Sequence, residues 1–196
     1  TPLETAQQKA VEALHGQSDE QLQWLGADRL ETRWRLPVMD GVFLADTNTG
    51  EVRREDGEHV RPNWRILALH YLAVRARPDL QPPAVTFASQ PSARVYASVY
   101  EQRVNLRLCA GVGKDASTLQ TVVAAIGARV VAGGDLAFEV NVFPRLLIRL
   151  IWYAGDQELS PSCTILLPAN TESFLCTEDI VVLSESFVSR LSGKPF

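Results

Sequence analysis

Hydrophobic residues recur at helical spacing in several stretches of the chain, and capping or stop residues mark most of their ends. Ser18, Ser117 and Thr177 are suited to cap helix N-termini, and Pro62 is suited to the first turn of a helix. The pattern predicts helices over residues 3–14, 18–25, 63–77, 117–126 and 177–191. Residues 95–108 are predicted to form a further helix or an irregular segment.

Other stretches carry the pattern of strands. Apolar and charged residues alternate from 29 to 39, which predicts one half-buried strand with a charged face. Residues 42–45 and 51–54 flank Thr47-Asn48-Thr49-Gly50, a sequence typical of a hairpin turn. The remaining β-rich runs are residues 84–87, 128–132, 136–142, 146–152 and 163–167. Turn residues separate the later runs, which favours antiparallel pairing.

The order of these elements predicts the fold class. The helices are placed too irregularly between the strands for successive βαβ units. We therefore predict an α+β fold, in which helices pack on a mostly antiparallel sheet in a single domain. Residues 1–28 are expected to form an N-terminal helical segment of this domain, and residues 29–196 its α+β part.

Composition is that of an ordinary globular protein, and it excludes two classes of partner. With 196 residues, 46% of them hydrophobic, the chain can bury a core without metals or disulfides. The 19 Lys and Arg are outnumbered by 23 Asp and Glu, which excludes a general nucleic-acid binder. The longest apolar run, residues 143–154, contains charges and is shorter than the ~20 residues of a membrane helix, so no membrane partner is predicted.

The cysteines Cys109, Cys163 and Cys176 lie far apart in the sequence. They form no C-x-x-C pair, so their spacing predicts neither a zinc site nor an iron–sulfur cluster, and we expect no cofactor. Each is expected to be a buried free thiol. The odd number of cysteines and the lack of a secretory segment at the amino end predict a cytoplasmic location. Gly111-Val112-Gly113-Lys114 lacks the spacing and the final hydroxyl residue of a phosphate-binding loop.

The helix predicted over residues 63–77 carries the densest group of unusual side chains, namely Trp64, His70 and Tyr71. His70 is a candidate general base or metal ligand. No second histidine and no Glu-x-x-His arrangement accompanies it, however. A lone imidazole on a largely apolar helix is more often a hydrogen-bonded core residue, so both interpretations of His70 stay open.

A second candidate group lies between and after the β-rich runs 136–142 and 146–152. Arg145 interrupts this largely apolar stretch, and a buried arginine needs either a carboxylate partner or an anionic ligand. Trp152 is followed by Gly155-Asp156-Gln157-Glu158. Asp156 and Glu158 can hold a divalent ion or share acid and base roles. In the alternative interpretation they are exposed residues of an ordinary hairpin loop.

These stretches, together with Phe-Leu-Cys-Thr-Glu-Asp at residues 174–179, resemble a known family in order and spacing. It is the prokaryotic domain-of-unknown-function family with the serial three-seven-eight-six, and the resemblance covers about residues 33–191. The chain departs from the family pattern at Gln157, where an acid is expected, and at residues 92–94, where glycines are expected. Some members of the family carry an additional iron–sulfur segment, which implies a redox or corrinoid-linked accessory role. The resemblance implies no particular reaction.

The function that these residues favour is that of a non-catalytic accessory domain, which binds a small ligand or a partner protein. In this hypothesis Trp64, Tyr71 and Trp152 form apolar walls of the site. Arg145 supplies the charge that fixes an anionic group.

Two alternatives remain. In the first, the protein is a hydrolase or lyase in which Asp156 and Glu158 position a metal ion or water while His70 relays a proton. In the second, the protein has a structural or assembly role, and the strand that carries Trp34 pairs with another subunit at an exposed sheet edge.

Overall fold

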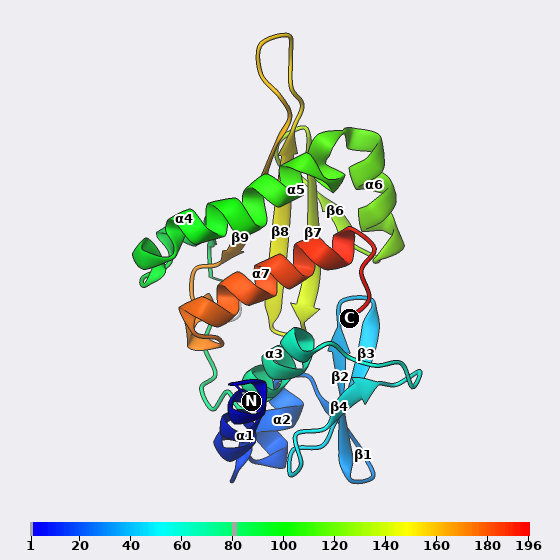
Figure 1. Ribbon diagram of the computed structural model, residues 1–196, viewed down its shortest axis with the longest axis vertical. Coiled ribbons are helices and arrows are strands. Elements are labelled where there is room, and N and C mark those ends of the chain that lie inside the picture. Colours follow the sequence, from blue (N-terminus) through cyan, green and yellow to red (C-terminus); the bar gives the residue numbers. More distant parts are fainter. Residues whose placement is uncertain (1, 80–81) are drawn as a thin grey trace.

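The computed structural model describes residues 2–79 and 82–196, and it contains two antiparallel sheets with helices beside each of them (Figure 1). The first sheet has the strand order β1-β2-β3-β4, and the second has the order β5-β9-β8-β7-β6. The predicted α+β class is confirmed. The antiparallel pairing expected from the sequence is found in both sheets.

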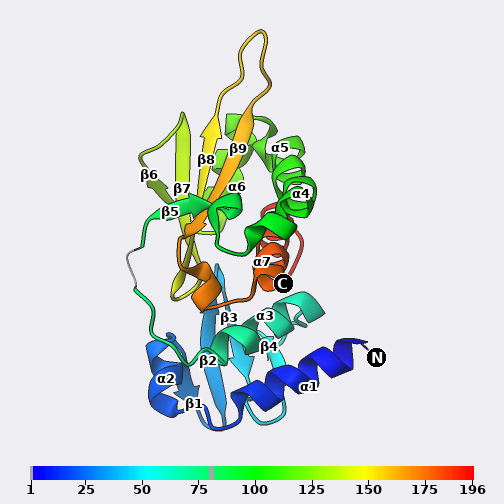
Figure 2. The ribbon, with the colours of Figure 1, turned by 90° about the vertical axis from the view of Figure 1, so that its left-hand side faces the viewer.

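The first sheet is a meander of short strands with three helices beside it (Figure 2). Its strands are β1 (Asp28–Leu30), β2 (Arg33–Val38), β3 (Gly41–Ala45) and β4 (Val52–Arg54). The helices are α1 (Pro2–Leu14), α2 (Asp19–Trp24) and α3 (Pro62–Leu72). Gly50 closes the β3–β4 turn with a φ of 73°, and a Cβ there would lie 2.4 Å from Val11. The turn therefore needs glycine both for its backbone conformation and for its packing on α1.

The second sheet separates an apolar face from a mixed one. Its strands are β5 (Ala84–Thr86), β6 (Arg129–Val131), β7 (Leu136–Phe143), β8 (Leu146–Tyr153) and β9 (Ser162–Pro168). Phe138, Leu150 and Ile165 are cross-strand neighbours on the apolar face and are buried. Glu139 and Arg149 are neighbours on the opposite face, as the two-residue period of a strand requires.

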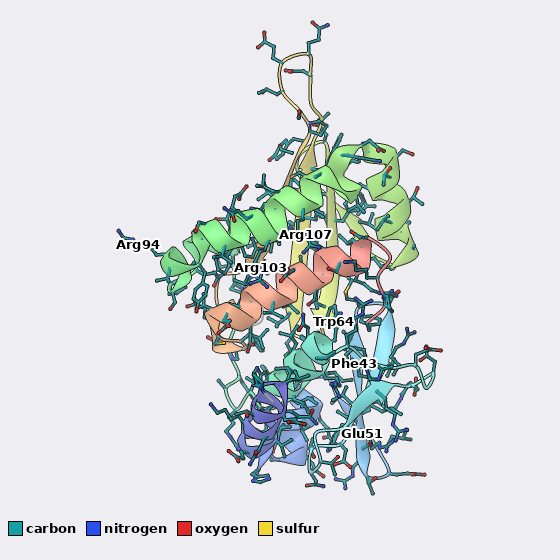
Figure 3. All side chains as sticks on the ribbon, in the orientation of Figure 1. Phe43, Glu51, Trp64, Arg94, Arg103 and Arg107 are labelled. Carbon is teal, nitrogen blue, oxygen red and sulfur yellow. The ribbon has the colours of Figure 1, made fainter. Side chains whose placement is uncertain are left out.

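Helices cover the apolar face of the second sheet, and no helix of residues 2–79 or 82–196 covers the mixed face (Figure 2). They are α4 (Ala97–Tyr100), the π-helix η3 (Glu101–Asn105), α5 (Leu106–Ala110), α6 (Ala116–Ala125) and α7 (Thr177–Leu191). Short 3₁₀ turns are η1 (Phe87–Ser89), η2 (Ala93–Val95), η4 (Val112–Lys114) and η5 (Thr171–Ser173). Arg103 and Arg107 lie on the helical segment beside α7 (Figure 3), and both form ion pairs with Glu185.

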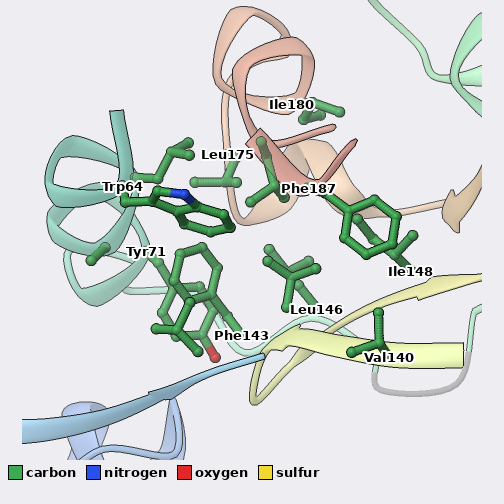
Figure 4. Close-up of a cluster of buried hydrophobic side chains, with 14 of the residues drawn as sticks. Trp64, Tyr71, Val140, Phe143, Leu146, Ile148, Leu175, Ile180 and Phe187 are labelled. Carbon is green, nitrogen blue, oxygen red and sulfur yellow. The ribbon is translucent and has the colours of Figure 1, made fainter. Parts of the chain in front are cut away.

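The two halves of the molecule share a hydrophobic core. Side chains from α3, α7 and the second sheet meet there, among them Tyr71, Phe143 and Phe187 (Figure 4). The Tyr71 and Phe143 rings are stacked with centroids 4.6 Å apart. The backbone N–H of Met39 also donates to the carbonyl of Val142 at 3.1 Å, which joins the end of β2 to β7. Packing and backbone hydrogen bonds therefore both link the sheets.

Two predicted elements were wrong in extent. The strand expected over residues 29–39 is a hairpin, β1 and β2, because Glu31 takes a φ of 55° and reverses the chain. The helix expected over residues 63–77 ends at Leu72. The side chain of Gln17 donates to the carbonyls of Leu72 and Val74, both at 2.8 Å, and so holds the following segment in a non-helical conformation.

The position of Trp34 also corrects an expectation. It lies on β2, which is paired with β1 on one side and β3 on the other. Its side chain is buried in the core. Among the described residues, β2 is therefore paired on both sides at Trp34, and the exposed sheet edge expected there is not formed.

Candidate functional site

Arg145 is held rigidly at the end of the second sheet. It lies in the tight Pro144-Arg145 turn between β7 and β8, rather than inside a strand as the sequence suggested. Its backbone N–H donates to the Tyr71 hydroxyl at 3.0 Å, and its Nε donates to the carbonyl of Trp24 at 2.8 Å. The guanidinium carbon lies 4.9 Å from the centre of the Trp24 ring, a cation–π distance. These contacts fix the direction of the side chain.

Stretches that carried the family resemblance converge around this turn. The Phe174 ring is stacked with both Tyr71 and Trp24, at centroid distances of 6.2 Å and 6.5 Å. At Gly26 an added Cβ would lie 2.3 Å from the Cβ of Pro144, and the residue has a φ of 91°. Glycine therefore allows the turn to pack against the end of α2.

A small cavity of about 160 Å³ opens beside Arg145 on the mixed face of the second sheet. Its lining residues include Asp79, Glu139, Arg145, Leu147, Arg149 and Leu166. The volume is more than the 10–15 Å³ that one water requires, yet below the ~300 Å³ at which drug-sized sites begin. The cavity is therefore of a size for a compact molecule.

Of the two arginines that line the cavity, one is paired with a carboxylate of the described residues and the other is not. Glu139 is 9% exposed and accepts hydrogen bonds from Arg149 Nε at 2.9 Å and from Arg129 Nη2 at 3.3 Å. Arg149 is thus paired. Within residues 2–79 and 82–196, no carboxylate lies at ion-pair distance from Arg145, and no hydrogen bond uses its Nη1 or Nη2. Among the described residues, Arg145 therefore has no ion-pair partner, although it shares the lining of the cavity with Asp79.

Glu139 and Arg149 were not singled out by the sequence reasoning. Each is a single charge inside a largely apolar strand, which is the sequence feature that could have indicated a role. That they form a pair follows only from the strand register, which places the two side by side on neighbouring strands.

The three aromatic residues proposed as walls of the site are core residues instead. Trp64 is 3% exposed and packs edge-to-face on Phe43 and Phe196. Tyr71 is fully buried, and burial raises the pKa of its hydroxyl, which donates to the Leu25 carbonyl at 2.6 Å. Trp152 is buried elsewhere, on β8. None of the three lines the Arg145 cavity.

His70 pairs with a carboxylate other than those expected. Its Nδ1 lies 2.7 Å from Oδ2 of Asp179, at the start of α7. Cys176 lies in the same surface groove. Partial burial raises the pKa of the Cys176 thiol, which opposes formation of a thiolate. The groove thus contains an oriented histidine but no activated nucleophile.

Asp156 and Glu158 are far from His70. They lie in the long β8–β9 hairpin loop, at the opposite end of the second sheet from α3 (Figures 1 and 2). Oδ1 of Asp156 accepts the backbone N–H groups of Glu158 and Leu159, both at 2.8 Å, and these bonds lower its pKa. No group of three potential metal ligands is found in the described part of the chain. The arrangement required by the hydrolase or lyase hypothesis is therefore not formed.

Fold and site together define an α+β protein of two antiparallel sheets with a small arginine-lined cavity. Residues 19–190 match the family described as "Domain of unknown function (DUF3786)", and the chain belongs to this family, as the sequence motifs suggested. No curated protein and no solved structure matches the chain. Among the described residues, no helix has both the length and the apolar character needed to cross a membrane.

Proposed function

We propose that this protein binds a compact carboxylate in the cavity beside Arg145, without transforming it chemically. The observation that supports this most directly is the guanidinium of Arg145, which lines the cavity and has no partner anion within the described residues. A carboxylate is matched to the two parallel N–H donors of a guanidinium edge.

The structure of the turn favours binding. Trp24 already holds the guanidinium of Arg145 and Tyr71 holds its backbone, so little side-chain freedom is lost when a ligand binds. Leu147 and Leu166 offer apolar surface to the short carbon chain of such a ligand.

The lining gives little support to catalysis. Glu139 is the buried carboxylate of the cavity, and both of its oxygens accept hydrogen bonds from arginines. An acid held in this way is poorly placed to exchange a proton with a ligand.

The test is a titration of the ¹⁵N-labelled protein with sodium acetate and sodium glycolate, followed by amide chemical shifts. Shifts are expected to concentrate at the β7–β8 turn and at Leu147 and Leu166. Arg145→Gln is expected to weaken binding about 10–100-fold, because a charge-assisted hydrogen bond contributes about 1.5–3 kcal/mol.

Two controls separate binding from general effects. Arg94→Gln removes an exposed arginine outside the cavity lining, so it should leave the affinity unchanged. Sodium chloride at equal ionic strength measures screening. Equal affinities of wild type and Arg145→Gln, or shifts equally produced by chloride, would refute the proposal.

A further inference from the structure

Two cysteines that are distant in sequence lie against each other between α5 and β9. The backbone N–H of Cys163, on β9, donates to Sγ of Cys109, on α5, at 3.3 Å. Sγ of Cys109 in turn lies 3.9 Å from the carbonyl oxygen of Cys163. Both thiols are free. The packing of α5 on the second sheet thus brings Cys109 and Cys163 together, although their spacing in the sequence does not predict a pair.

The two thiols differ in exposure. Cys163 is 6% exposed, and its Sγ lies over Gly113, where an added Cβ would be only 2.3 Å away. Trp152 is the cross-strand neighbour of Cys163, and its Nε1 donates to the Gly113 carbonyl at 2.8 Å. Cys109 is partly exposed. Solvent and small reagents therefore reach Cys109 more readily than they reach Cys163.

We propose that Cys109 and Cys163 form a redox-active pair, which closes reversibly into an intramolecular disulfide by exchange with a low-molecular-weight disulfide. Cys109 is the attacking thiol and Cys163 the resolving thiol. This inference is independent of the Arg145 cavity, whose lining includes neither cysteine.

The exchange proceeds in two balanced steps. The Cys109 thiolate attacks one sulfur of glutathione disulfide, which forms a mixed disulfide on Cys109 and releases one glutathione thiolate. Cys163 then attacks Sγ of Cys109, and its proton passes to the departing second glutathione. Starting from the Cys109 thiolate, the protein loses two electrons and one proton. Glutathione disulfide becomes one glutathione and one glutathione thiolate, which takes its proton from the solvent.

The electrostatic environment agrees with this division of roles. The interaction with the Cys163 thiol, together with the backbone N–H of Cys163, lowers the pKa of the Cys109 thiol to about 6. The same interaction and burial raise the pKa of the Cys163 thiol. These opposite shifts favour the thiolate on Cys109 and the protonated thiol on Cys163, as in other asymmetric reactive dithiols.

The test uses the whole protein, equilibrated in buffers with increasing ratios of glutathione disulfide to glutathione. Samples are quenched with acid, denatured and alkylated with N-ethylmaleimide, and the mass of the intact chain is measured by mass spectrometry. The reduced chain, with its three cysteines, should carry three adducts. The oxidised chain should carry one, on Cys176, and peptide mapping should show Cys109 joined to Cys163.

Variants distinguish the roles of the two thiols. Cys163→Ser should accumulate the mixed disulfide on Cys109, because its resolving thiol is gone. Cys109→Ser should form no intramolecular disulfide. The matched control Cys176→Ser should oxidise like the wild type, and circular dichroism checks that each variant is folded. Glutathione found only on Cys176, disulfide-linked dimers alone, or no disulfide at any ratio would overturn the proposal.

A pH profile gives a readout that does not depend on disulfide formation. The rate of iodoacetamide alkylation at Cys109 follows the thiolate fraction, so it should rise with pH around a midpoint near 6. Cys163→Ala should move this midpoint upward, because it removes the neighbouring thiol. A wild-type midpoint at the ordinary value of about 8.5 would contradict the assignment of Cys109 as the attacking thiol.

Discussion

Replacing Trp64 with alanine is expected to lower the free energy of unfolding by about 3–5 kcal/mol, because the substitution empties a large buried volume. The indole is 3% exposed. Its ring centre lies 5.3 Å from that of Phe196 and 6.4 Å from that of Phe43, both in edge-to-face contact. These aromatic contacts contribute beyond the buried area itself. Urea unfolding followed by circular dichroism measures the change.

Two further variants make this result interpretable. Trp64→Phe retains an aromatic ring and should cost clearly less than Trp64→Ala. Val130→Ala shortens a side chain that is 76% exposed, and it should change stability by no more than about 0.5 kcal/mol. A loss below about 1 kcal/mol for Trp64→Ala would mean that the indole is exposed in solution, and it would restore Trp64 as part of a binding surface.

Tyr71→Phe is expected to cost about 1–3 kcal/mol although it removes a single oxygen atom. The hydroxyl donates to the Leu25 carbonyl at 2.6 Å and accepts the backbone N–H of Arg145 at 3.0 Å. Its loss leaves both backbone groups without this partner, and the Leu25 carbonyl belongs to a fully buried residue. The ring itself keeps its stacking on Phe143, so the cost is due to the hydrogen bonds.

The matched control for this variant is Tyr153→Phe. Tyr153 is 47% exposed, and water can replace any partner of its hydroxyl, so the substitution should be close to neutral. Equal stabilities of wild type and Tyr71→Phe in urea unfolding would show that the bridge between Leu25 and Arg145 contributes nothing. The position of Arg145 would then have to depend on its contacts with Trp24 alone.

The two proposed activities lie on different surfaces of the second sheet. The Arg145 cavity is on the mixed face, which no helix of the described residues covers, whereas Cys109 and Cys163 lie between α5 and the apolar face. Variants of one site can therefore serve as folded controls for the other. A change at the cysteines that altered carboxylate binding would show that the two faces are coupled through the sheet.

The fold class could be predicted from the sequence because its signals are local. Runs of strand-forming residues separated by turn residues mark β7, β8 and β9. Ser18 caps α2 through its own hydroxyl, which accepts the N–H of Gln21. The family resemblance also follows from local motifs. Arg145 was recognised as a charge in need of a partner for the same reason, since a cation in an apolar run is unusual wherever the chain places it.

Other features depend on contacts between distant segments, and only the tertiary structure decided them. Glu31 reverses the chain between β1 and β2 without a glycine, and Gln17 ends α3 from more than fifty residues away. The sequence pattern predicted Trp64 and Trp152 as walls of a binding site, but the packing of the elements buries both in the core. Conversely, Cys109 and Cys163 are separated by 54 positions and look unrelated until α5 lies on β9. Local patterns specify which elements form and which face is apolar, whereas the partners of each side chain are set by how those faces meet.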